Sequence, residues 1–302
     1  MFMEDFAMHE IALVIIYNHQ YNENVPVLEE IYKKRFSSIF HLVPFYAGNR
    51  ANVIPVYENS RYFQGYIAQG FNRFYDKNFT HYFFIADDLL LNTLVNQNNC
   101  YEYLHLDDGA CFLPEFISLH ERETWWARVG DAFRFNLNTP GVEARKQLPD
   151  YQAALHKFSE FGLDIKPLKF NQIWKKPASI RDCLLNYEFY IARKLRCALT
   201  NEKFHLSYPL LGGYSDIFVI SSNAIKQFCH YCGIFAAMNL FVEVAIPTAM
   251  VLSAQSIVTE KDLKMQGKAL WTKEELATLD KYNYELKNFL MIFRQIICIY
   301  IR

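Results

Sequence analysis

The sequence has no long apolar run and no basic stretch at its start, and both absences bear on where the protein works. No segment approaches the ~20 consecutive apolar residues that span a bilayer. The chain begins Met-Phe-Met-Glu-Asp-Phe, which is acidic, whereas a secretory signal opens with basic residues. The first apolar run, 11–17, is also too short for a signal core. We therefore expect a cytoplasmic protein.

An excess of positive charge is absent too, and cysteine is sparse. The 302 residues include 31 Lys and Arg against 32 Asp and Glu, for a formal net charge of -1. A nucleic-acid partner calls for a strongly basic surface, so no nucleic acid is expected. The 7 cysteines are too few for a disulfide scaffold, and their number is odd, so we expect reduced thiols.

Apolar residues, by contrast, are plentiful. At 52% of the chain they exclude a mainly disordered protein, and the length allows one large domain or a domain with an appended lobe. Three common catalytic signatures do not occur: the Gly-x-x-x-x-Gly-Lys phosphate loop, the Gly-x-Ser-x-Gly elbow and His-Glu-x-x-His.

Strand and helix patterns alternate through the first third of the chain. Continuous apolar runs predict strands covered on both faces, and apolar positions at helical spacing predict the helices between them. We predict strands at 11–17, 39–46, 53–57 and 82–86, and helices at 25–36 and 63–75. This alternation is typical of an α/β fold with a mostly parallel central sheet and helices on both faces.

The last third of the chain also shows regular patterns. We predict a strand at 216–220, a helix that Ser222 would cap, and a final helical region over 270–302. In that last region apolar residues recur every three or four positions and Lys281, Lys287, Arg294 and Arg302 add positive charge. Such a stripe packs on the domain itself, joins a second subunit in a homodimer, or contacts an anionic membrane surface.

The sharpest motif is Asp87-Asp88, directly after the apolar strand 82–86. A strand that ends in adjacent aspartates puts two carboxylates at the carboxyl edge of a parallel sheet, where ligands bind in open α/β folds. The pair repels itself unless a cation lies between, and Mg²⁺ and Mn²⁺ take oxygen ligands and share them with phosphates. A metal site is one interpretation, and a cap for a helix or turn at Leu89 is the other.

Two further features carry chemistry. Gly212-Gly213 leads through Tyr214-Ser215 to Asp216 at a strand start, which suits close backbone approach to a ligand or an ordinary tight turn. Glu243 stands alone among apolar residues, an environment that suits a general acid or base, and equally a buried salt bridge.

The order of these features resembles that of the nucleotide-sugar-dependent glycosyltransferases with the GT-A fold, over about residues 10–255. The resemblance implies a Rossmann-related sheet and a metal-binding "DxD" motif at Asp87 and Asp88, with Mn²⁺ or Mg²⁺ holding the donor's diphosphate. It further implies that Tyr17 and Asn18 contact the nucleotide base. Gly212, Gly213 and Asp216 would line the donor sugar and the acceptor. Glu243 would be the catalytic carboxylate on the acceptor side, and Asp216 would be catalytic as well.

The expected function is therefore metal-dependent transfer of a sugar from a nucleotide-sugar donor to a glycan or glycolipid acceptor, in cell-surface polysaccharide synthesis. A nucleotidyltransferase acting on sugar phosphates and a non-catalytic carbohydrate-binding protein are the alternatives. The expected domains are 1–255, with a nucleotide-binding half over about 1–120 and an acceptor half over about 121–255, and a helical C-terminal extension over 256–302. Peripheral contact with the inner membrane face through that extension is one of the expectations above.

Overall fold

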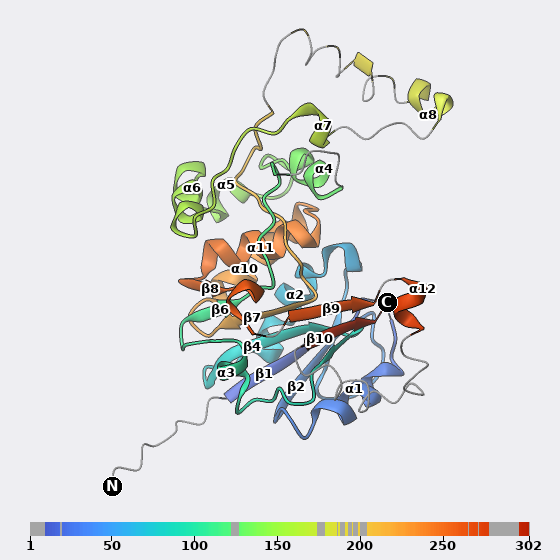
Figure 1. The fold of residues 1–302 in the computed structure, drawn as a ribbon, viewed down its shortest axis with the longest axis vertical. Coiled ribbons are helices and arrows are strands. Elements are labelled where there is room, and N and C mark those ends of the chain that lie inside the picture. The colour runs from blue at the N-terminus through green and yellow to red at the C-terminus, as the bar shows by residue number, and fades with distance from the viewer. Residues whose placement is uncertain are drawn as a thin grey trace.

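The computed structural model describes most of the chain from residue 10 onward (Figure 1). The residues outside the description are 1–9, 19, 122–126, 174–178, 186, 188–190, 193–194, 196–198, 200–203, 265, 271, 278–295 and 302.

A seven-stranded mixed sheet forms the centre of the molecule, in the order β3-β2-β1-β4-β7-β6-β8. The first four strands of this order pair in parallel, β7 runs antiparallel to both its neighbours, and β6 pairs in parallel with β8. The strands are β1 (Glu10–Ile16), β2 (Ser38–Pro44), β3 (Val53–Val56), β4 (Phe79–Ala86), β6 (Ala110–Phe112), β7 (Ile217–Ser221) and β8 (Ser256–Val258).

Both faces of this sheet are covered. Side chains alternate along a strand, so Ala12, Val14 and Ile16 of β1 enter one core cluster and Leu13 and Ile15 enter the other. The first cluster contains residues of α2 (Gln64–Phe74), α10 (Ile225–Ala237) and α11 (Val242–Ser253), and the second contains residues of α1 (Asn24–Tyr32). The predicted α/β class, with a mostly parallel sheet between helices, is confirmed.

A second, three-stranded sheet has the order β5-β10-β9 and is built from β5 (Leu89–Leu91), β9 (Gln266–Leu270) and β10 (Ile296–Ile301). It corrects the predicted helix over 270–302, because Ile296–Ile301 is a strand that pairs with β5 and β9. Only the short α12 (Lys273–Leu276) is helical among the described residues of that stretch, and 278–295 lie outside them.

The middle of the chain forms short helices. Among them, α4 and α6 pack on α11, and α7 contacts α4, so they extend the α11 side of the molecule (Figure 1). The remaining elements are α3 (Cys100–Tyr103), α4 (Ala127–Arg134), α5 (Ala144–Gln147), α6 (Tyr151–Glu160), α7 (Phe170–Ile173) and α8 (Ile180–Leu185), with short 3-10 turns at Ser60–Tyr62 and Glu260–Asp262.

The predicted cap at Ser222 is wrong. The helix begins at Ile225 with Ala224 in the cap position, and the Ser222 backbone N–H donates to Thr80 O, which prolongs the pairing of β7 with β4.

The six described cysteines are free thiols. Within the described residues no helix combines the length and the apolar character needed to cross a membrane.

Candidate functional site

The ends of β1 and β4 and the start of β7 meet at one edge of the sheet. The Asp87 N–H donates to Ile16 O at 2.8 Å, and the Ala86 N–H donates to Asp216 O at 2.8 Å. Because β7 is antiparallel to β4, its first residues lie beside the last residues of β4. The fold therefore brings together Asn18, the acidic pair and Asp216, which are far apart in the sequence.

Asn18 holds both members of the acidic pair. Its backbone N–H donates to Asp87 Oδ1 at 3.1 Å, and its side-chain amide donates to Asp88 Oδ2 at 3.5 Å. Asp87 is buried and Asp88 is half-buried. After Asp88 the chain turns directly into β5, so neither aspartate caps a helix.

The side chains at this edge supply only some of the ligands that a hard divalent cation needs. Within the described residues, no three His, Cys, Asp or Glu side chains gather closely enough to hold a metal by themselves. Two adjacent carboxylates nevertheless match the way Mg²⁺ is usually bound, through one or two carboxylates, substrate phosphates and water. Asp87 and Asp88 would thus supply the protein ligands, and the rest would come from a bound substrate.

Tyr66 of α2 and Glu58 are further polar groups at this edge, and neither was predicted. Burial first, and then the negative charges of Glu58 and Asp87, together raise the pKa of Tyr66 to about 12. This coupling puts the Tyr66 hydroxyl within electrostatic reach of both carboxylates. Glu58 follows β3 as Asp87 follows β4, so its place after a predicted strand was a usable signal.

Tyr17, by contrast, points away from the edge and into the second core cluster. Its ring is fully buried, and its hydroxyl lies 3.0 Å from Nδ1 of the buried His41. The other ring nitrogen, Nε2, lies 2.7 Å from Glu29 Oε2. A carboxylate only accepts, so Nε2 carries the proton and Tyr17 donates to Nδ1. The Tyr17 side chain thus stabilises the end of β1 from inside.

The glycine pair packs against α11. Gly212 exchanges two backbone hydrogen bonds with Ile117, and the Gly213 N–H donates to Glu243 O at 2.9 Å. That carbonyl is available because Pro247, four residues further along α11, has no N–H to donate to it. A Cβ on Gly213 would come within 2.7 Å of Glu115 O, so only glycine fits here without a shift. Both glycine amides are therefore used inside the chain.

Glu243 lies in the first turn of α11 and forms an ion pair with Arg128 of α4. Both side chains are partly exposed, so the pair faces solvent beside the glycine loop. The three Cα-to-Cα steps from Gly213 to Asp216 can span at most ~11 Å, which keeps the start of α11 near the end of β4. Glu243 does form a salt bridge, but a partly exposed one and not the buried pair that was the alternative, and its catalytic role stays a prediction.

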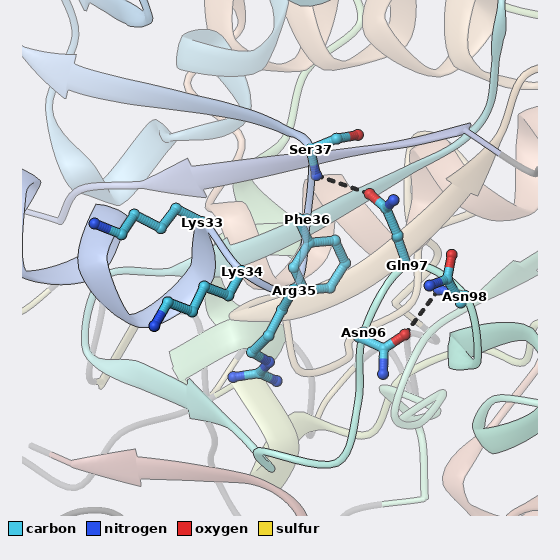
Figure 2. Close-up of a pocket in the computed structure, with 8 residues that line it drawn as sticks. All are labelled: Lys33, Lys34, Arg35, Phe36, Ser37, Asn96, Gln97 and Asn98. Carbon is cyan, nitrogen blue, oxygen red and sulfur yellow. Dashed lines mark hydrogen bonds between the residues drawn. The ribbon is translucent and has the colours of Figure 1, made fainter.

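A separate hollow of about 300 Å³ lies at the opposite edge of the sheet, where β2 begins (Figure 2). Figure 2 shows Ser37 facing Gln97, whose side-chain oxygen accepts the Ser37 N–H at 2.7 Å. The Arg35 guanidinium donates to Val95 O at 2.6 and 2.8 Å and to Asn92 O at 2.5 Å. These bonds hold the 92–97 loop against α1, so the polar groups of the hollow already have a structural role.

The similarity of this chain to known proteins is distant and structural. No family model matches the chain, and neither does any curated protein sequence. Among solved structures, the chain is similar to the apo structure of WbbM, a bifunctional glycosyltransferase, with a TM-score of 0.40 and 9% identity. The match covers 97% of this chain and 45% of that one, so this chain spans less than half of the WbbM chain. A similarity this low leaves the function to be argued from the site.

Proposed function

We propose that this protein is a divalent-cation-dependent glycosyltransferase that takes its sugar from a nucleotide-sugar donor. One observation carries the proposal: Asn18 at the end of β1 holds Asp87 and Asp88 at the end of β4, with Asp216 alongside. The carboxyl edge of an open α/β sheet is where such folds bind ligands. An acidic pair fixed at that edge suits a diphosphate that arrives with a cation.

The residues at this edge of the sheet would have different roles. Asp87 and Asp88 would hold Mg²⁺ or Mn²⁺, which when bound would neutralise the diphosphate as it leaves. Asn18 orients both carboxylates through its two hydrogen bonds. Asp216 and Tyr66 would line the donor from the β7 and α2 sides.

Glu243 would serve the acceptor, a glycan or glycolipid of the kind used in cell-surface polysaccharide synthesis. Its carboxylate stands beside the glycine loop and is paired with Arg128. An acceptor hydroxyl that displaced Arg128 would meet a carboxylate able to accept its proton.

The test is a donor-hydrolysis assay with a panel of nucleotide sugars and Mn²⁺. We expect slow release of nucleoside diphosphate, abolished by a chelator and by Asp87→Asn. Asp164→Asn is the matched control, because Asp164 is exposed and forms an ion pair with Lys166 on the surface. Release of nucleoside triphosphate with added pyrophosphate would instead identify a nucleotidyltransferase, and no turnover or binding of any donor would refute the proposal.

A further inference from the structure

Tyr32, the last residue of α1, holds the backbone that directly follows the acidic pair. Its hydroxyl donates to Leu89 O at 3.4 Å and accepts the Leu91 N–H at 3.1 Å. Leu89 is the residue after Asp88 and begins β5. The tyrosine therefore contacts the main chain one residue beyond the pair.

The two hydrogen bonds suit the place of β5 in its sheet. β5 is an edge strand in the order β5-β10-β9, with β10 as its neighbour. An edge strand presents main-chain groups that no neighbouring strand takes. The Tyr32 hydroxyl, which both donates and accepts, bonds to one group of each kind on β5.

The Tyr32 ring is fixed in position by its surroundings. It is fully buried in the same core cluster as Leu89 and Leu91, and the Arg35 guanidinium carbon lies 5.1 Å from the ring centre. Burial raises the pKa of Tyr32 to about 12, so the hydroxyl keeps its proton and donates it to Leu89 O. A phenylalanine would fill the same space, so what tyrosine adds here is the two hydrogen bonds.

The acidic pair is thus anchored on both sides along the chain. Before it, Ile16 O accepts the Asp87 N–H, and Asn18 donates to both carboxylates. After it, Tyr32 holds the next residue. A ligating carboxylate has to be placed within about 0.5 Å of its working position. Release of either anchor should therefore weaken cation binding.

We propose that Tyr32 is a positioning residue for the cation site: its hydroxyl fixes the start of β5 and so sets where the Asp88 carboxylate lies. This inference rests on the proposed function, because it requires a cation and a nucleoside diphosphate at the acidic pair. A purely structural role for the hydroxyl would change the stability of the fold and leave cation-dependent binding as it is.

Calorimetry on Tyr32→Phe tests the proposal, because this variant keeps the ring and removes the hydroxyl. The probe is whichever of uridine, cytidine, guanosine, adenosine and thymidine diphosphate wild type binds most tightly with Mn²⁺. We expect the affinity of Tyr32→Phe for this probe with Mn²⁺ to fall at least about fivefold. With a chelator in place of Mn²⁺, the affinities of variant and wild type should agree within about twofold.

Tyr82→Phe is the matched control. Tyr82 is also fully buried, and its hydroxyl donates to Asp76 O at 2.7 Å and accepts the Asp76 N–H at 3.2 Å. Asp76 precedes β4, whereas the acidic pair follows it, so the same two kinds of bond are lost at the far end of the strand. Tyr82→Phe should bind the probe like wild type, and urea should unfold the two variants at similar concentrations.

The outcomes separate this inference from the proposed function. Unchanged Mn²⁺-dependent affinity in Tyr32→Phe, or an equal loss in Tyr82→Phe, would overturn the positioning role while wild type still binds the probe. If wild type itself shows no Mn²⁺-dependent binding of any of the five diphosphates, the proposed function fails, and the positioning role fails with it.

Discussion

His41 links three elements through side chains that the sequence patterns did not connect. It lies on β2, contacts Tyr17 at the end of β1, and hydrogen bonds to Glu29 on α1, while Asn52 donates to the same Glu29 oxygen at 2.9 Å. Burial lowers the pKa of His41, against the opposing effect of Glu29, and the positive charge of Arg50 lowers it slightly more. The ring therefore stays neutral in the folded protein at pH values where the unfolded chain binds a proton.

This shift predicts a pH-dependent stability. The folded pKa lies below the unfolded value of about 6.5, so the stabilisation is complete above pH 6.5 and is lost as the pH falls below it. Each pH unit in that window costs up to ~1.4 kcal/mol of unfolding free energy. Urea unfolding between pH 5 and pH 8 should show this loss in wild type, and a smaller loss in His41→Gln. Parallel curves for the two proteins would show that His41 does not cause it.

A second prediction for a single residue concerns Glu243 and the catalytic activity. Glu243→Gln keeps the shape of the side chain and removes its charge, so turnover should fall by about 10²-fold or more while donor affinity stays within about twofold. Asp131→Asn is the matched control, because Asp131 is also a partly exposed carboxylate in ion pairs, with Arg61 and Arg134. If both variants lose turnover equally, or if neither does, Glu243 has no acceptor role.

At the scale of elements, the glycine loop and α11 hold each other in place. Gly213→Ala would bring a Cβ to 2.7 Å from Glu115 O and 3.1 Å from the Pro247 Cβ. We expect it to destabilise the fold by ~1–3 kcal/mol, as overpacking does. Gly109→Ala is the control, because its Cβ would meet nothing closer than 3.5 Å. Urea unfolding compares the two, and equal stability of both variants would contradict this packing role.

The strands and helices of the first third were predictable from the sequence. The run at 11–17 is β1 and the helical spacing at 63–75 is α2, each within a residue or two of its observed ends. A strand whose two faces are both buried gives a continuous apolar run, and a helix with one buried face gives apolar residues every 3.6 positions.

The end of the chain was not predictable in the same way. Phe293, Ile296, Ile297 and Tyr300 recur at three- and four-residue spacing, which suits a helix. The β-branched isoleucines favour a strand, however, and a short apolar run does not decide between the two. What decides is pairing with β5 and β9, which are distant in the sequence.

The candidate site was predictable only in its parts. Asp87 and Asp88 could be placed at a strand end, because the strand before them is a clear apolar run. The contact with Asn18 and the ion pair of Glu243 with Arg128 depend on tertiary packing that no local pattern encodes. The same holds for Tyr17, whose buried ring has its partner on another strand.

At the scale of the whole molecule, strand direction assembles the site. A parallel β7 would place Asp216 at the opposite edge of the sheet, whereas the antiparallel strand brings it beside Ala86. The buried glycine loop then links this acidic edge to the start of α11 through the hydrogen bond from the Gly213 N–H to Glu243 O.

The central claim is that Asp87 and Asp88 bind a cation together with a nucleoside diphosphate. Calorimetric titration of nucleoside diphosphates with Mn²⁺ tests it most directly, on wild type, Asp87→Asn, Asp88→Asn and the surface control Asp164→Asn. Removing one charged ligand should cost at least about tenfold in affinity, a loss of ~1.4 kcal/mol, while the control binds like wild type. Unchanged Mn²⁺-dependent affinity in both Asp87→Asn and Asp88→Asn would contradict the account.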